Sequence, residues 1–327
     1  MKLMICANLN VGGLPAIDLP SGKIAKWQED KIESLAAALS DAKNHGMDAC
    51  IVAGGLFAKG FVAQSLLTET LEEAGCHDIP VYYVPIVGEL ADADDRIPHI
   101  AGVYVIEPNN DGRGEIAFEK QGLTIPVVEG SGLEEVEGIA RPDGAIAIMR
   151  CGNDIGVSMN DGSEFRRLGS LEPGSFGEKS KSGYLIVKVK NGVANAKWTE
   201  MATHPFVVHE VKLDGLESSR ELVTTVGEAV KEVDRNACLR IELRGRIPLG
   251  VYINTAALAE QLENYFFYVE VVDECALDID VADLETDVSL LAEFVRQASG
   301  DDSLSETEKT RILRCGWNVL NGKELAE

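Results

Sequence analysis

The sequence lacks any apolar run long enough to cross a membrane. Its longest apolar stretches fall well short of the roughly 18 consecutive residues that a transmembrane helix requires. The N-terminal segment, MKLMICANLN, also lacks the basic region and the longer apolar region of a signal peptide. We therefore expect a cytoplasmic protein that has no membrane partner.

Basic residues are scarce. The 327 residues include 30 lysines and arginines against 54 aspartates and glutamates, so the formal net charge is −24. Such a surface repels phosphate backbones, which predicts weak or no direct nucleic-acid binding by this chain alone. The densest acidic run, residues 270–287, has eight acids and no base. It is typical of a solvated face or a linker, and the alternative is an acidic module that binds basic partners.

Paired cysteines are also absent. The seven cysteines are odd in number, widely spaced and never arranged as C-x-x-C, which argues against a zinc ribbon or a disulfide framework. We expect buried free thiols, because cysteine is among the residue types most often buried. A redox pair of Cys6 and Cys151 at a common cleft is the alternative.

The apolar pattern of the first half predicts a parallel sheet. Strands expected at 2–7, 48–53 and 81–87 alternate with helices expected at 24–45 and 61–74. This β-α-β-α-β order predicts right-handed crossovers. Short strand patterns follow at 102–108, 114–119, 123–129, 144–149, 183–190 and 192–201. They predict that the sheet continues as a mixed one.

A second pattern begins near Pro205 and predicts a compact α+β unit. We expect strands and helices in the order 206–213, 218–233, 238–245, 255–265 and 267–273, with helices at the second and fourth ranges. Two more helices are expected at 288–297 and 305–320. Ser305 and Glu308 have the spacing of a capping box at the start of the last helix.

Two asparagines follow the first predicted strand, where a catalytic or ligand-binding residue would be expected. In α/β proteins the crevice at the carboxyl ends of the strands is the usual ligand site, and Asn8 and Asn10 follow the first strand at i, i+2 spacing. Asparagine has no ionisable proton and is a weak, neutral oxygen ligand. The pair therefore predicts a polar strand exit without charge, stabilised by hydrogen bonds to the loop backbone.

Four stretches, in chain order, resemble the calcineurin-like metallophosphoesterases, and within them the DNA-repair nuclease subunits of the SbcD and YhaO type. In that family successive strands end in D-x-H-x-G, G-D-L-F-D, G-N-H-D and G-H-x-H. Here the corresponding stretches are ANLNVG, VAGGLFAKG, YYVPIVGEL and AIAIMRCGN. The segment RLGSLEPGSFGEKSKSGYLIVKV also matches the family's G-S turn and F-G-E segment.

The resemblance implies a fold and a set of partners. It implies an α/β metallophosphoesterase-like β-sandwich flanked by helices, in αββα order, over residues 1–204. Residues 205–287 resemble the family's small α+β capping domain. Residues 288–327 resemble the helical pair that binds the coiled coil of an SMC-like ABC ATPase, and subunits of this type also form homodimers.

The family's metal ligands have no matching residues here. Two clustered metal ions need histidines and carboxylates, one of which bridges both ions. Asn8 stands at the first aspartate, Asn10 at the histidine and Gly55 at the bridging aspartate. Glu89 ends the third motif, and Arg150 and Cys151 lie in the last one, while all five histidines fall outside the motifs. The resemblance therefore implies a catalytically degenerate structural or regulatory subunit, with no confident catalytic residue and no metal or cofactor.

Alternatives remain open at several positions. Asn8, Asn10, Glu89 and Asp143 could together bind Mn²⁺ or Mg²⁺, which would make the protein an active phosphodiesterase or nuclease with a rearranged site. Arg150 could neutralise a phosphate or replace the charge of a metal. The apolar residues Leu313, Trp317 and Leu320 share one helix face, which could contact a coiled coil or the protein's own domain. The basic residues between 166 and 190 favour a solvated face over an anion site.

Overall fold

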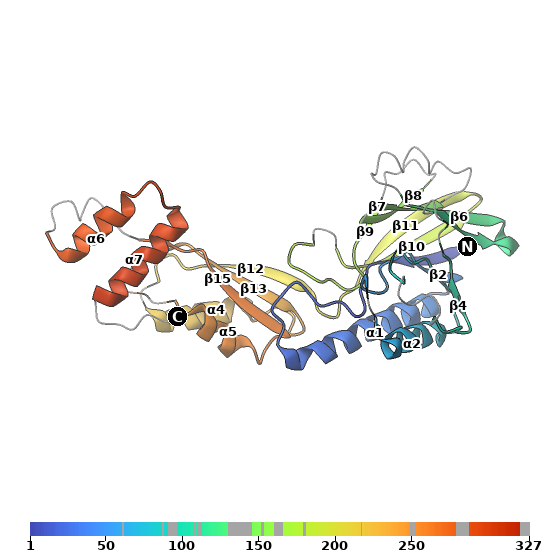
Figure 1. The fold of residues 1–327 in the computed structure, drawn as a ribbon, viewed down its shortest axis with the longest axis horizontal. Helices are drawn as coiled ribbons and strands as arrows, with labels where there is room; N and C mark the ends of the chain where they lie inside the picture. The colour runs from blue at the N-terminus through green and yellow to red at the C-terminus, as the bar shows by residue number, and fades with distance from the viewer. Residues whose placement is uncertain are drawn as a thin grey trace. The chain divides into compact units, whose positions relative to one another are not determined.

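The structure, a computed structural model, shows a mixed α/β protein of two compact units, Met1–Pro205 and Phe206–Glu327 (Figure 1). It describes the chain except for residues 61, 87, 91–96, 108, 110–112, 130–145, 152–153, 160–165, 179–180, 217, 249–250, 252, 279–287 and 321–327. Helices 288–297 and 305–320 were expected to form a separate segment, and the structure places both within the second unit. Among the described residues, no helix is both long enough and apolar enough to cross a membrane.

The first unit is built on a six-stranded mixed sheet. Its strands run in the order β11-β10-β1-β2-β3-β4. Four of them, β1 (Lys2–Cys6), β2 (Ala49–Val52), β3 (Val81–Tyr83) and β4 (Val103–Val105), are parallel, while β10 (Gly183–Lys190) and β11 (Val193–Glu200) join antiparallel. The crossovers are α1 (Ser21–Asn44) and α2 (Gln64–Gly75), which confirms the predicted β-α-β-α-β order.

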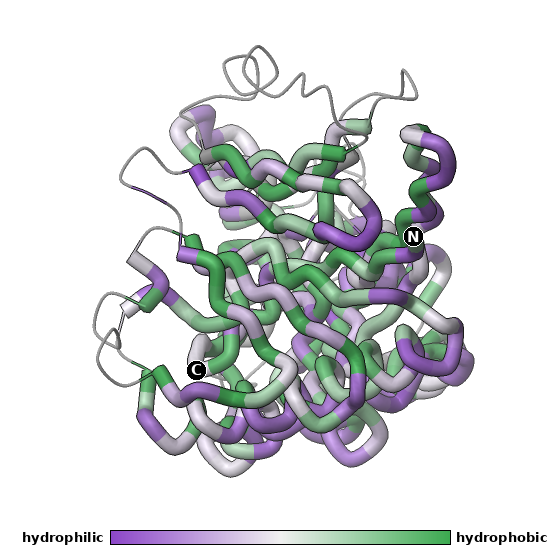
Figure 2. Tube along the Cα trace, turned by 90° about the vertical axis from the view of Figure 1, so that its right-hand side faces the viewer, coloured by the Kyte–Doolittle hydropathy of each residue, from purple (hydrophilic) through white to green (hydrophobic). Residues whose placement is uncertain are grey.

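Both faces of this sheet are buried, and the side chains of β1 show how. Met4 and Cys6 pack with the apolar faces of α1 and α2, whereas Leu3 and Ile5 pack against a second sheet. A strand buried on both faces reads as a continuous apolar run, which explains the sequence KLMIC. Figure 2 shows green, hydrophobic stretches that alternate with purple, hydrophilic ones along the trace.

The second sheet has five strands in the order β5-β6-β7-β8-β9. These are β5 (Arg113–Phe118), β6 (Leu123–Glu129), β7 (Ile146–Cys151), β8 (Asp154–Met159) and β9 (Arg166–Leu168). The sequence predicted β5, β6 and β7 but not β8 or β9. Within the described residues, α1 and α2 cover one outer face of the pair of sheets, and no α-helix covers the other.

The second unit confirms the predicted order of strands and helices, but its sheet is of the α/β type and not of the expected α+β type. Its sheet is parallel throughout, in the order β12 (Phe206–Lys212), β13 (Cys238–Arg244) and β15 (Tyr268–Asp273), with α4 (Ser219–Val230) and α5 (Thr255–Leu262) as crossovers. Two short strands, β14 (Arg246–Ile247) and β16 (Ala276–Leu277), also pair in parallel and were not predicted. One apolar core joins the sheet to both helices.

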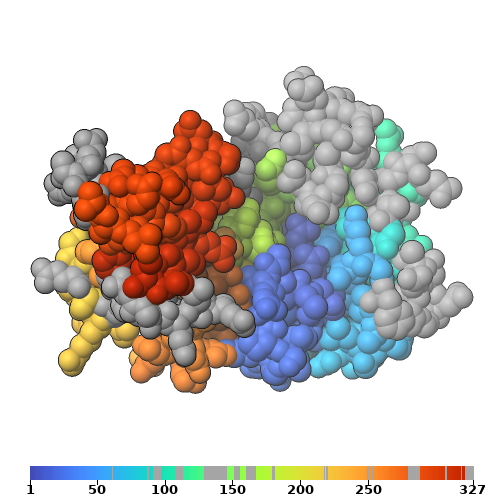
Figure 3. All heavy atoms as spheres, turned by 60° about the vertical axis from the view of Figure 1, so that its left-hand side comes forward, coloured from blue at the N-terminus to red at the C-terminus, as the bar shows by residue number. Residues whose placement is uncertain are grey.

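The last two helices, α6 (Leu290–Ser299) and α7 (Glu306–Leu320), pack as a pair and lie together in red in Figure 3. A Cβ added at Gly316 would lie 2.2 Å from the ring of Phe294, so glycine lets the two helices approach closely. The capping box is confirmed, because the Ser305 N–H donates to Glu308 Oε2 at 2.8 Å and the Glu308 N–H donates to Ser305 Oγ at 3.3 Å.

The cysteines depart in part from expectation. Cys6, Cys50, Cys238 and Cys275 are buried free thiols, as predicted. Cys76 and Cys315 are exposed, since each lies at or near the solvent side of a helix, and the prediction of burial was wrong for both. The side chain of Cys151 lies outside the described residues, so the proposed pairing with Cys6 is not described either.

Candidate functional site

Asn8 and Asn10 both adopt left-handed backbone conformations, with φ of 54° and 53°. Asparagine is one of the few residues with a side chain that tolerates this conformation. The turn lets the Asn8 and Asn10 N–H groups donate to the Gly54 and Gly55 carbonyls at 2.9 and 2.8 Å. The loops after β1 and β2 therefore run side by side, and the asparagines meet a backbone requirement at the strand exit.

Gly55 leaves no space for a side chain. Its φ is +64°, and an added Cβ would lie 2.5 Å from Asn8 Oδ1 and 3.0 Å from Asn8 Cα. Gly54 is equally confined, because a Cβ there would lie 2.7 Å from Ile86 Cγ2 and 3.2 Å from Arg150 Nη1. The position that the resemblance assigns to a bridging aspartate is thus filled by close contact between the two loops.

Glu89 is the centre of this edge of the sheet. Its carboxylate is 1% exposed and accepts four hydrogen bonds. Oε2 accepts from the Gly55 and Ile86 N–H groups at 3.0 and 2.8 Å. Oε1 accepts from the Phe57 N–H at 2.8 Å and from the Tyr83 hydroxyl at 2.6 Å. A buried carboxylate is stable only when it is paired in this way, and the four donors belong to the exits of β2 and β3.

Arg150 enters the same region from β7 and is fully buried. Its Nη1 donates to the carbonyls of Val84 and Pro85, at 3.0 and 2.8 Å. Burial first, and then the negative charge of Glu89, raise the pKa of Tyr83 well above its ordinary value, while Arg150 lowers it. The phenol therefore stays a hydrogen-bond donor to Glu89 over the physiological pH range.

The same contacts explain why the third strand is shorter than the predicted 81–87. Regular pairing ends at Tyr83. Beyond it, Pro85 has no N–H to donate, and the N–H of Ile86 goes to Glu89. The segment 84–86 is instead held by two buried charged side chains, Arg150 and Glu89.

Helix α1 supports the loop after β1 with two polar side chains. Gln28 accepts from the Gly12 N–H at 2.8 Å and donates to the Gly13 carbonyl at 2.9 Å. Lys31 Nζ donates to the Asn10 carbonyl at 2.7 Å. Burial lowers the pKa of Lys31 from 10.5 to about 8, although the nearby Glu172 and Glu178 act in the opposite direction.

A second buried polar cluster joins α1 to the end of the first unit. Glu172 accepts from the Thr203 and His204 N–H groups at 2.9 and 2.6 Å and from the Ser34 hydroxyl at 2.9 Å. His204 Nε2 lies 2.7 Å from Asp30 Oδ2, and both side chains are 5% exposed. Because Glu172 binds backbone donors with both oxygens, we interpret this cluster as a structural network that fixes the GSLEP loop.

The structure brings together most of the residues singled out in the sequence. Asn8, Asn10, Gly55, Glu89 and Arg150 contact one another or the same loops at the carboxyl ends of their strands. Asp143 lies outside the described residues, and so does the side chain of Cys151. Of the four oxygen ligands expected for a weak metal site, Glu89 is the one carboxylate that the structure describes.

Sequence reasoning missed Tyr83, Gln28 and Lys31. Lys31 had a detectable signal, because it lies four residues from Trp27 and four from Leu35, on the buried face of α1. A charged residue on an apolar helical stripe indicates a buried polar contact. Tyr83 gave no such signal, since an aromatic residue is ordinary in a strand.

No family model and no curated protein matches the chain, so these comparisons assign no function to this site.

We predict that Glu89→Gln destabilises the first unit. An amide offers one acceptor oxygen and places an NH₂ group against N–H donors, so about 3 kcal/mol of unfolding free energy should be lost. Denaturant unfolding measures the loss. Glu115→Gln, at an exposed position on β5, is the matched control and should change stability by less than about 0.5 kcal/mol. Equal effects of the two substitutions would contradict the anchoring role of Glu89.

We also predict a pH dependence that originates in Lys31. Its pKa is about 8 in the folded protein against 10.5 ordinarily, so the unfolded chain binds more protons between these values and stability rises with pH there. The buried charge costs up to about 3 kcal/mol below pH 8, and the cost disappears towards pH 10.5. The unfolding free energy of the wild type minus that of Lys31→Met should therefore rise between pH 8 and pH 10.5. A difference that stays constant would refute it.

Proposed function

We propose that this chain is a catalytically inactive protein of metallophosphoesterase-like architecture, similar to nuclease subunits of the SbcD and YhaO type. It serves as a structural or regulatory subunit beside an SMC-like ABC ATPase. The observation that carries the loss of catalysis is the environment of Glu89. Its two oxygens already accept four hydrogen bonds, so the carboxylate is committed to the loop backbone.

Three of the four expected layers support the architectural part of the proposal. The described residues form αββ layers, and the second outer helical layer of the expected αββα order is not among them. Two sheets pack face to face, with α1 and α2 on the outer face of the six-stranded sheet. The four motif-like stretches lie at the carboxyl ends of β1, β2, β3 and β7. That arrangement is the one a metallophosphoesterase-like sandwich requires, because its metal ligands come from the ends of several strands.

The packing of the strand exits supports the absence of metal chemistry. Two metal ions need a shared carboxylate to balance their repulsion. At position 55 a side chain would collide with Asn8, and at position 89 the carboxylate holds four donors. A cation at this edge would have to take Glu89 away from those donors, which leaves buried N–H groups without an acceptor at a cost of about 1 to 3 kcal/mol each.

The helical pair supports the partner part of the proposal. Val288 and Leu290 are 97% and 73% exposed, and Val319 and Leu320 near the end of α7 are 56% and 42% exposed. Exposed apolar residues at the start of α6 and the end of α7 suit a coiled-coil partner. The predicted stripe of Leu313, Trp317 and Leu320 is divided, because Leu313 is 6% exposed and buried within its own unit. Arg314 beside it binds Asp273 and the Cys275 carbonyl.

We predict that chelator-treated protein binds no Mn²⁺ up to millimolar concentration in calorimetric titration. It should also leave a phosphodiester substrate and DNA uncleaved in the presence of Mn²⁺, because the one described carboxylate among the expected ligands is already occupied. Glu89→Gln and Asn8→Ala are the matched variants. Micromolar Mn²⁺ binding or hydrolysis that either substitution abolishes would favour the rearranged phosphodiesterase instead.

We predict that affinity purification of the intact protein recovers an ABC-type ATPase with a long coiled coil. Leu290→Asp combined with Val319→Asp should abolish the recovery, since two charges would enter an apolar contact. Val193→Asp is the control, because Val193 is 46% exposed and belongs to the first unit. Recovery of basic proteins alone would support the acidic interaction module. Equal recovery with the double variant would exclude the helical pair as the docking site.

A further inference from the structure

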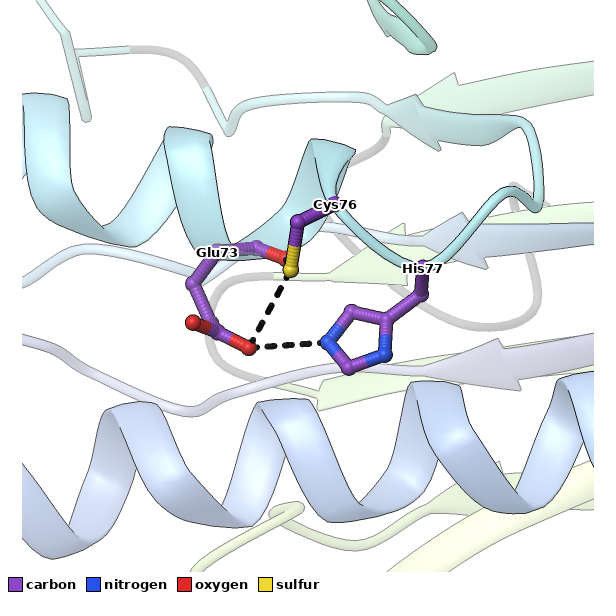
Figure 4. A group of neighbouring side chains, drawn as sticks. All are labelled: Glu73, Cys76 and His77. Carbon is purple, nitrogen blue, oxygen red and sulfur yellow. Dashed lines mark hydrogen bonds and ion pairs between the residues drawn. The ribbon is translucent and has the colours of Figure 1, made fainter.

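Three side chains with metal-binding atoms gather at the end of α2, away from the strand exits. Glu73 lies in the last turn of α2, Cys76 caps the helix and His77 follows. Figure 4 shows the Glu73 carboxylate directed at both the thiol and the imidazole ring. Glu73 Oε1 is 2.8 Å from His77 Nε2 and 3.5 Å from Cys76 Sγ. The three ligand atoms all lie within 4.8 Å of one another.

These separations are close to those of a tetrahedral zinc site. Zinc binds nitrogen, oxygen and sulfur ligands at about 2.0 to 2.3 Å, so ligand atoms in a tetrahedral site are about 3.4 Å apart. The 3.5 Å between Glu73 Oε1 and Cys76 Sγ already matches this spacing, and the 2.8 Å between Glu73 Oε1 and His77 Nε2 is about 0.6 Å shorter. The donor set also selects the metal, because thiolate and imidazole prefer zinc over magnesium, calcium or manganese.

Helix α1 holds the imidazole ring in a suitable orientation. Ser40 Oγ lies 3.2 Å from His77 Nδ1, which leaves Nε2 directed at Glu73. Metal-binding histidines usually make such a bond through the second ring nitrogen, which fixes the ring and its tautomer. The His77 side chain is 14% exposed, so the ring is enclosed, whereas Cys76 is exposed and leaves a path for an ion.

The local charge also suits a cation. Glu73 Oε1 lies 3.5 Å from the Cys76 thiol, so a cation there would bind beside a carboxylate. Metals bind the thiolate form of cysteine, so a bound cation displaces the thiol proton. Metal binding would then release a proton, and its affinity would rise with pH.

We propose that Glu73, Cys76 and His77 form a zinc site on the first unit, with a fourth coordination position open to water. The site is independent of the strand exits, since none of its ligands contacts Glu89 or the asparagine loop in the described contacts. It would link the end of α2 to α1 through the bond between His77 and Ser40.

Cobalt substitution tests the proposal directly. Reduced, chelator-treated full-length protein titrated with Co²⁺ should develop a near-ultraviolet thiolate-to-cobalt charge-transfer band at one equivalent, and Zn²⁺ should displace it. Cys76→Ser should abolish the band and lower the zinc affinity at least about 100-fold, while Ser40→Ala should lower it about tenfold. Cys315→Ser, at the exposed cysteine of the second unit, is the matched control and should change neither.

Two results would overturn the zinc site. One is a wild-type titration without a charge-transfer band, which would leave the triad as a helix-end hydrogen-bond cluster. The other is a band that persists in Cys76→Ser, which would assign the thiolate to another cysteine. The affinity measured at successive pH values should also rise by up to about tenfold per unit, as release of one proton requires. An affinity independent of pH would exclude the thiol as a ligand.

Discussion

The hydrogen bonds to the Glu89 carboxylate are the contacts on which the carboxyl edge of the first sheet depends. Where parallel strands end, their backbone N–H groups lose ladder partners and need other acceptors. Gly55, Phe57 and Ile86 all direct N–H groups at Glu89, and the Tyr83 hydroxyl completes the set. The dependence is mutual, because the buried carboxylate is tolerable only with such donors. The loops after β2 and β3 are therefore held by one side chain.

Buried cations complete this arrangement through carbonyl groups. Arg150 binds the carbonyls of Val84 and Pro85, and Lys31 binds that of Asn10. Each cation thus serves a loop whose carbonyls lack strand partners. In the segment after β3, Glu89 accepts from a backbone N–H group, that of Ile86, and Arg150 donates to two backbone carbonyls. The hydrogen bonds of Glu89, Arg150 Nη1 and Lys31 described at this edge are thus mostly made to the protein's own backbone.

The elements of the fold were largely readable from the sequence, and the contacts of the site were not. The strands β1 and β2, both crossover helices, and the three-stranded sheet and the helices of the second unit follow from apolar periodicity and end signals. The sequence did not predict β8, because DIGVSM begins with aspartate and contains a glycine, which makes its apolar alternation weak. The asparagine pair was correctly placed at the strand exit, but its left-handed backbone depends on the neighbouring β2 loop, which no local pattern encodes. The hydrogen bonds of Glu89 likewise join residues 32 and 34 positions away.

The packing also leaves no room for a carboxylate side chain at position 55. An aspartate at position 55 would need a Cβ 2.5 Å from Asn8 Oδ1 and 3.0 Å from Asn8 Cα, which is closer than real Cβ contacts. Moving Asn8 would break its backbone bond to Gly54 and separate the two loops. A bridging carboxylate would further require Glu89 to leave its four donors. The amide, glycine and glutamate positions therefore constrain one another, and the strand exits form a single packed unit in which each residue requires the others.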